Sequence, residues 1–179
     1  ACSKTEEKKV EGSDQQTVTT QEAPKPVVNQ RYGIKSGFIK YTAPMGTEQE
    51  LYFDEYGAKE LFVTSIDLGV AKSKTIEIRK DGYAYSYEEG KTEGTKRAWY
   101  AAASSDFSKA DPKTLERYKV KDLGTETIDG KECKKFSAEF GKTPILSWSW
   151  NNIMVKSVTQ MGGKDFVIEA VKIQDTSVD

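Results

Sequence analysis

The chain of 179 residues contains no histidine. Histidine is the commonest general base, the usual ligand of catalytic zinc and a member of the common catalytic triads, so its absence excludes most hydrolase mechanisms. The sequence also lacks a Gly-x-Ser-x-Gly elbow, a phosphate-binding glycine loop, a Cys-x-x-Cys pair and a calcium-binding loop. We therefore expect no catalytic residue, no metal and no cofactor, and we predict that the protein is not an enzyme.

Two further features are missing, and each excludes a class of partner. No stretch approaches the roughly 20 consecutive apolar residues that a membrane-spanning helix needs, so any membrane attachment is expected to be covalent or superficial. The 27 basic and 28 acidic residues give a net charge of −1, without the basic excess that binding to a phosphate backbone requires. Nucleic acid is therefore not an expected partner.

Aromatic residues are absent before Tyr32, whereas all three Trp, nine Tyr and seven Phe follow from there on. The first part of the chain is instead rich in Thr, Gln, Glu, Lys and Ser, a composition that cannot offset the entropy lost on folding. We predict a disordered tether over residues 1–30 and a single domain over residues 31–179. A flexible coil of this length spans roughly 30 Å, which holds the domain clear of a bilayer surface.

The sequence has only two cysteines, Cys2 and Cys133. In Ala1-Cys2-Ser3 a small residue, at which a signal peptide could end, is followed by a cysteine. This pattern resembles the bacterial lipobox. We expect Cys2 to be lipidated, in which case Ala1 is not part of the mature protein. A disulfide between Cys2 and Cys133 is the alternative, although it would tie a flexible terminus to a strand and stabilise little.

Cys133 itself lies in the alternating stretch Lys131 to Phe136, which places it on the face of Lys131 and Lys135, opposite Phe136. Neighbouring lysines lower the pKa of a thiol, and this would make Cys133 reactive. Because there is no histidine to serve as its base, we interpret Cys133 as a solitary thiol on a strand.

Beyond Gln30 the sequence consists of short alternating runs separated by glycine turns, the pattern of an antiparallel sheet with hairpin connections. The clearest hairpin signals are Asp81-Gly82, Asp129-Gly130 and Gly162-Gly163. One helix is expected, capped by Asp106 or Asp111 and starting at Pro112. These features predict a mainly β fold with a minor helical part, namely a curved antiparallel sheet or incomplete β-barrel with one or two short helices.

Aromatic residues recur at every second position in two of the expected strands. Tyr83, Tyr85 and Tyr87 share one face of the first, and Trp148 and Trp150 share one face of the second. Tyrosine and tryptophan suit a concave apolar surface with a few hydrogen-bonding groups, so we predict that these five residues bind a ligand. Packing within the core is the alternative for each set.

Two stretches resemble a known group of proteins: Gly130 to Phe136, and Trp148 to Ile153 with Lys156 and Ser157. Together they make residues 32–173 similar to uncharacterised Gram-negative lipoproteins of the Bacteroidetes type, which are themselves similar to the outer-membrane lipoprotein carrier and receptor (LolA/LolB-like) superfamily. The resemblance implies an incomplete antiparallel barrel wrapped around helices, with a hydrophobic cavity. No position is assigned to the carriers' functional arginine or to their membrane-inserting leucine loop.

These observations favour an outer-membrane lipoprotein, at the periplasmic face or the cell surface, attached to the membrane through Cys2. The expected function is to bind an apolar or amphipathic ligand, such as a lipid or a lipid-modified protein, in a concave cavity of the sheet. The alternative is a structural or interaction module of an envelope protein complex that has no small-molecule ligand.

Overall fold

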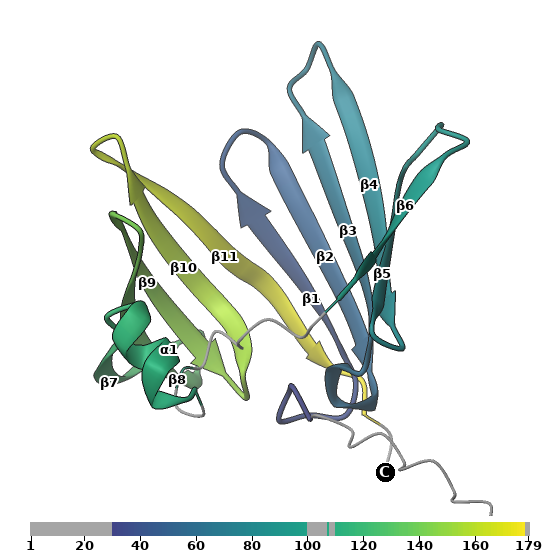
Figure 1. The fold of residues 1–179 in the computed structure, drawn as a ribbon. Helices are drawn as coiled ribbons and strands as arrows, with labels where there is room; N and C mark the ends of the chain where they lie inside the picture. Colours follow the sequence, from purple (N-terminus) through teal and green to yellow (C-terminus); the bar gives the residue numbers. More distant parts are fainter. Residues whose placement is uncertain (1–29, 100–106, 108–109, 178–179) are drawn as a thin grey trace, which may run out of the picture.

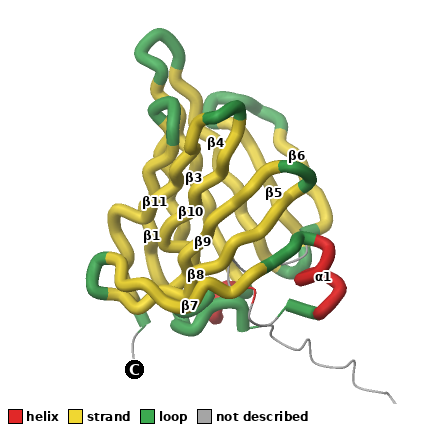
Figure 2. Tube along the Cα trace, turned by 90° about the vertical axis from the view of Figure 1, so that its left-hand side faces the viewer, coloured by secondary structure: helices red, strands yellow, loops and turns green. Residues whose placement is uncertain are grey.

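The computed structural model describes residues 30–99, 107 and 110–177, so Cys2 and nearly all of the predicted tether lie outside the described residues. The described chain forms one strongly curved 11-stranded antiparallel sheet, and we call its concave side the hollow (Figures 1 and 2). The elements in chain order are β1 Gly37–Ala43, β2 Thr47–Asp54, the 3-10 turn η1 Glu55–Gly57, β3 Lys59–Asp67, β4 Lys72–Lys80, β5 Tyr83–Glu88, β6 Gly94–Ala98, α1 Pro112–Arg117, β7 Lys121–Ile128, β8 Lys131–Phe140, β9 Thr143–Trp150, β10 Ile153–Met161 and β11 Lys164–Asp175.

The sheet consists of two meanders joined at its centre. Its strand order is β6-β5-β4-β3-β2-β1-β11-β10-β9-β8-β7, so every neighbouring pair is consecutive in sequence except β1 and β11. These two strands pair from Gly37 opposite Asp175 to Thr42 opposite Glu169. The edges are β6 and β7, which curl toward the viewer in Figure 1 and leave the barrel open. The predicted curved, incomplete antiparallel barrel is therefore confirmed.

Tight turns fix the register of the hairpins. Asp81 and Gly82 have φ values of 52° and 75°, and Asp129 and Gly130 have values of 48° and 74°. Positive φ at both central residues defines the type I′ turn, whose twist matches that of the flanking strands. Both Asp-Gly hairpins are therefore confirmed.

The predicted helix is also confirmed, as α1. The Asp111 side chain caps it by accepting a hydrogen bond from the Thr114 amide at 3.1 Å, and Pro112 occupies its first turn. Asp106, the other predicted cap, lies outside the described residues. Leu115 packs against a small cluster formed by Phe107, Phe136 and Ala138. The helix therefore lies on the face of the sheet to which Phe136 belongs, and we call this the inner face.

The main core lies on the same inner face at the centre of the sheet. Ile39 on β1 is fully buried, and Tyr41, Leu51 and Phe53 are at most 6% exposed. The pairing register places these residues on one face, because Ile39 lies opposite Leu51, which lies opposite Phe62. Tyr32, which precedes the sheet, packs its ring against Phe53 with the centroids 4.5 Å apart. The chain before β1 therefore closes one end of the hollow.

Candidate functional site

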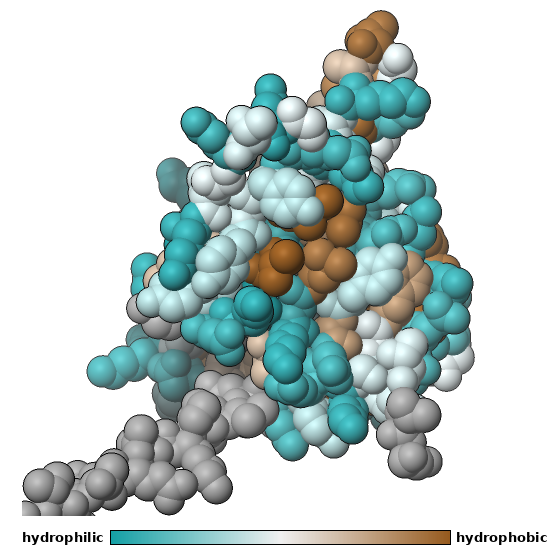
Figure 3. Space-filling view, turned by 90° about the vertical axis from the view of Figure 1, so that its right-hand side faces the viewer, coloured by the Kyte–Doolittle hydropathy of each residue, from teal (hydrophilic) through white to brown (hydrophobic). Residues whose placement is uncertain are grey.

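The predicted ligand-binding tyrosines lie on the outer face of the sheet, opposite the hollow. Ala84, between Tyr83 and Tyr85, is fully buried, whereas Tyr83 and Tyr87 are each 42% exposed. Lys96 on β6 lies over the Tyr83 ring, with its Nζ 4.0 Å from the centroid. Figure 3 shows this outer face, where aromatic and apolar side chains gather over β3 to β5. The tyrosines therefore do not line the hollow, and ligand binding by them stays a prediction.

The predicted tryptophans lie on β9, and β4, β3, β2, β1, β11 and β10 separate this strand from β5. Trp148 is 6% exposed and packs with Cys133 and Val155 in a separate cluster. Trp150 packs both against this cluster and against the main core. The indole Nε1 of Trp148 donates a hydrogen bond to Glu126 at 3.0 Å. The structure thus brings Trp148 and Trp150 together but keeps both away from the tyrosines.

Cys133 lies opposite Phe136, as predicted, and it is a free thiol. It is fully buried, and its Sγ donates to the carbonyl oxygen of Lys131 at 3.4 Å. Burial raises the pKa of the Cys133 thiol, and this outweighs the opposing effects of the Ile128 backbone hydrogen bond and of Lys131. Cys133 therefore resembles a structural thiol of the core more than a nucleophile.

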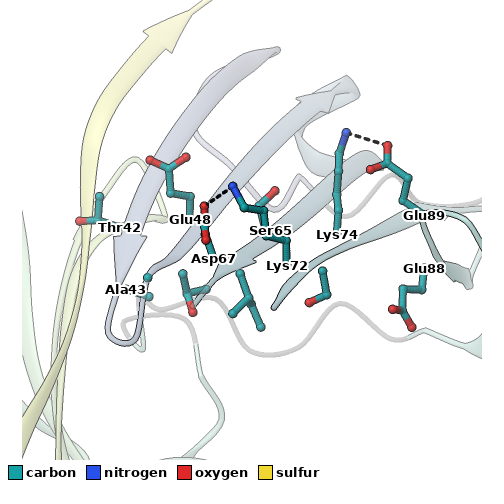
Figure 4. Close-up of a pocket in the computed structure, with 13 residues that line it drawn as sticks. Thr42, Ala43, Glu48, Ser65, Asp67, Lys72, Lys74, Glu88 and Glu89 are labelled. Carbon is teal, nitrogen blue, oxygen red and sulfur yellow. Dashed lines mark hydrogen bonds and ion pairs between the residues drawn. The ribbon is translucent and has the colours of Figure 1, made fainter. Parts of the chain in front are cut away.

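A polar groove of about 880 Å³ lies around the ends of β1 to β5 (Figure 4). Lys72 forms an ion pair with Asp67 at 2.8 Å, and Lys74 forms one with Glu89 at 3.3 Å. Since these charges are paired and the groove is open, we do not assign it to an apolar ligand.

A smaller pocket of about 210 Å³ lies on the inner face. One part of its wall is apolar, and another part consists of two guanidinium groups. The lining residues are Arg31, Tyr32, Tyr41, Gln49, Leu51, Phe62, Arg79, Asn152 and Met154. This combination of an apolar surface with a few fixed polar groups is the usual composition of a small-molecule site.

A buried carboxylate fixes the two arginines of this pocket. The side chain of Glu60 is fully buried; its Oε1 accepts hydrogen bonds from Arg31 and from the Tyr32 hydroxyl at 2.8 Å. Its Oε2 accepts a hydrogen bond from Arg79 Nη1 at 2.9 Å. A buried charge is costly unless it is paired and hydrogen-bonded, and Glu60 is both. The carboxylate therefore holds both guanidinium groups at the pocket wall.

The buried network extends outward through Arg79 to Glu77, which also accepts a hydrogen bond from Arg97 at 2.8 Å. Trp99 lies over both pocket arginines, with its ring centroid 5.4 Å from Arg31 Cζ and 5.7 Å from Arg79 Cζ. Because every one of these groups has a partner on another segment, the arginines are preorganised before any ligand arrives.

Two tyrosine hydroxyls complete the pocket as neutral groups. Burial is the main cause that raises the pKa of Tyr32 and of Tyr41 far above the ordinary value. Tyr32 therefore donates a hydrogen bond to Glu60, and Tyr41 donates one to the carbonyl oxygen of Met154 at 2.9 Å. The second hydrogen bond joins β1 to β10 and fixes the apolar wall near Met154.

Sequence reasoning did not identify Glu60, Arg31 and Arg79 as site residues. A signal was present for two of them. Glu60 precedes Phe62 by two positions and so shares its inward face, and Glu77 and Arg79 alternate with Ile76 and Ile78. Charged residues on the face that turns inward indicate a buried polar network.

The ion pairs of Glu77 make the stability of the protein depend on pH. Burial alone would raise the pKa of Glu77, but hydrogen bonds from Arg79 and Arg97 outweigh it and hold that pKa below the ordinary 4.5. These ion pairs therefore stabilise the folded protein fully at pH values above the pKa that Glu77 has in the unfolded state. The stabilisation is lost as the pH falls through the lower pKa of Glu77 in the folded state. We expect the free energy of unfolding to fall less steeply in acid for Glu77→Gln than for the wild type. Urea unfolding at a series of pH values measures this difference, and equal acid limbs would contradict it.

At the far end of the sheet, the hairpin between β3 and β4 projects beyond its neighbours (Figure 1). Its tip exposes two apolar side chains, with Leu68 51% and Val70 99% exposed. The sequence pattern did not indicate a membrane-contacting apolar loop here. The structure provides an exposed apolar tip, flanked by the lysines of β4.

The described residues define an open antiparallel half-barrel with a helix on its inner side. The incomplete antiparallel barrel that the resemblance to the lipoprotein carrier and receptor superfamily implied is confirmed, but the described residues contain one α-helix where the resemblance implied several. Within the described residues, no helix is long and apolar enough to cross a membrane, and no group of three or more His, Cys, Asp or Glu could hold a metal ion.

No protein-family model and no curated protein matches the chain. Solved structures do match it. An uncharacterized conserved protein from Thermus thermophilus is 8% identical, with a TM-score of 0.54 and coverage of 85% of both chains. PNGF-II is 15% identical with a TM-score of 0.51; the match covers 80% of this chain but only 28% of PNGF-II. The lipoprotein LppX of Mycobacterium tuberculosis matches less well, at 11% identity and a TM-score of 0.44, over 82% of this chain and 90% of LppX. At these identities the likeness establishes the fold alone.

Proposed function

We propose that this protein is a lipid-anchored protein of the outer membrane that binds an apolar or amphipathic ligand in the inner pocket. The observation that supports this most strongly is the pocket itself, where Leu51, Phe62 and Met154 face a hollow beside two arginines held by Glu60. Apolar surface that remains accessible next to preorganised polar groups is typical of a binding site. The function is therefore binding, with the sheet as a rigid support.

The anchor is part of the same proposal. Lipidation of Cys2 would keep the domain within roughly 30 Å of a bilayer, since that is the span of a flexible coil of the intervening length. The apolar tip with Leu68 and Val70 suits contact with a membrane surface. Mass spectrometry of the protein isolated from its native membrane tests the anchor: an acylated Cys2 supports it, and an unmodified thiol contradicts it.

Lipid that copurifies with the protein tests the binding function. We expect organic extracts of the full chain, purified from its native membrane, to contain a bound amphiphile at close to one molecule per protein. A Leu51→Glu variant, which puts a charge on the apolar wall, should lose this lipid. Ser65→Glu, at the polar groove outside the pocket, serves as the matched control. Absence of lipid from the wild type, together with failure to bind a fluorescent fatty acid, would contradict the proposal.

The alternative function is an interaction module of an envelope complex, and the outer face favours it. Tyr52 and Ile78 are 41% and 38% exposed, so β2 and β4 as well as β5 expose aromatic or apolar side chains on this face (Figure 3). Exposed apolar patches of this kind mark interaction sites. A photo-crosslinker at Tyr87 in cells should then capture one protein in stoichiometric yield, and a lipid-free protein with such a partner would favour this function over ligand binding.

A further inference from the structure

A network of arginines and glutamates lies beside the inner pocket. The connected network contains three arginines, Arg31, Arg79 and Arg97, against two glutamates, Glu60 and Glu77. The side chains of Arg31 and Arg79 are only 17% and 19% exposed. The third arginine, Arg97, is 56% exposed and lies outside the pocket lining, whereas the two shielded guanidinium groups line the pocket.

Glu60 leaves part of the hydrogen-bonding capacity of Arg31 and Arg79 unused. Both oxygens of Glu60 already accept hydrogen bonds, three in total from Arg31, Tyr32 and Arg79. A guanidinium group offers five N–H donors in a fixed planar fork, more than these contacts use. The Nε of Arg31 is buried and has no hydrogen-bond partner. The arginines therefore retain donor capacity next to the pocket.

The opposite part of the pocket accepts hydrocarbon. Leu51, Phe62 and Met154 provide its apolar wall, and the Tyr41 hydroxyl is already bound to the Met154 carbonyl oxygen. At about 210 Å³ the pocket is smaller than the roughly 300–1,000 Å³ typical of sites for drug-sized ligands. It therefore fits one small head group with the first part of an alkyl chain.

Building on the proposed function, we infer that the ligand is an anionic amphiphile. Its carboxylate or phosphate head group is bound by Arg31 and Arg79, and its alkyl chain lies against Leu51, Phe62 and Met154. Arginine is suited to this task because its fork matches the oxygens of both head groups. The head group accepts charge-assisted hydrogen bonds from these two arginines, so a neutral amphiphile of the same length binds less tightly.

Three probes of one chain length separate the contribution of the head group from that of the alkyl chain. Octanoate, octyl phosphate and octanol are titrated into the full-length protein by isothermal calorimetry. We expect the two anions to bind about 10- to 100-fold more tightly than octanol, the ratio given by a charge-assisted hydrogen bond. The tighter of the two anions identifies the head group as carboxylate or phosphate.

The variant Arg31→Gln tests the assigned residue. It balances the network at two positive and two negative charges, and it leaves Glu60 bonded to Arg79 and Tyr32, so the fold is expected to persist. It should lose most of the preference for the anions while octanol binding stays within about twofold. Arg117→Gln on α1, distant from the pocket lining, is the control and should bind all three probes as the wild type does.

The outcomes distinguish the two proposals. If octanol binds the wild type as tightly as the anions, or if Arg31→Gln keeps the full anion preference, the anionic head group is refuted and binding of an amphiphile stands. If none of the three probes binds the wild type, the proposed function falls together with the inference.

Discussion

Replacing Glu60 by Gln is expected to lower the free energy of unfolding by about 3–5 kcal/mol, the usual cost of removing one partner from a buried ion pair. The substitution keeps the shape of the side chain but removes the charge that Arg31 and Arg79 share. Both guanidinium groups would then be largely buried without a common counterion. Equilibrium unfolding in urea measures the loss.

The matched control is the same substitution in an exposed ion pair. Glu48 pairs with Lys40 at 3.0 Å, and the Glu48 side chain is 54% exposed. Exposed pairs contribute about 0–1 kcal/mol, so Glu48→Gln should change the stability by less than about 1 kcal/mol. If Glu60→Gln cost no more than this control, Glu60 would not be the group that holds the pocket arginines.

Replacing Ile39 by Ala is expected to destabilise the protein by about 2–5 kcal/mol, the range for removing a large aliphatic side chain from a packed core. Ile39 is fully buried on β1, opposite Ile173 of β11, where the two meanders join. A cavity at this position weakens the seam between the halves of the sheet. Thermal or urea unfolding monitored by tryptophan fluorescence measures the effect.

Ile78→Ala provides the comparison on the outer face. Ile78 is 38% exposed, so its removal should cost at most about 1 kcal/mol. Similar losses for the two variants would show that the inner and outer faces are equally packed, and this would contradict the assignment of the core to the inner face.

The local elements of this fold were predictable because local chemistry determines them. Asp81-Gly82 and Asp129-Gly130 specify type I′ turns by their own conformational preferences, and Asp111-Pro112 specifies a helix start. The edge strand β6 was not predicted, because Gly94 to Ala98 has no alternating apolar residues. Its pairing with β5 forms it, and this is tertiary context that no local pattern contains.

The long-range features were not predictable from one sequence. The pairing of β1 with β11 joins residues more than 120 positions apart, and no turn signal links them. Likewise, alternation placed Tyr83, Tyr85 and Tyr87 on one face but could not tell whether that face turns toward the hollow. The buried network depends on Arg31 reaching Glu60 across 29 positions. Only the folded sheet brings these side chains into contact.

The most direct test of the account is to locate a bound amphiphile by nuclear magnetic resonance. Octanoate added to ¹⁵N-labelled full-length protein should shift the amide signals of Leu51, Phe62 and Met154 and the guanidinium signals of Arg31 and Arg79. These groups line the inner pocket. Shifts confined to the outer-face tyrosines of β5, or no shifts at saturating octanoate, would contradict the central claim that the hollow is the binding site.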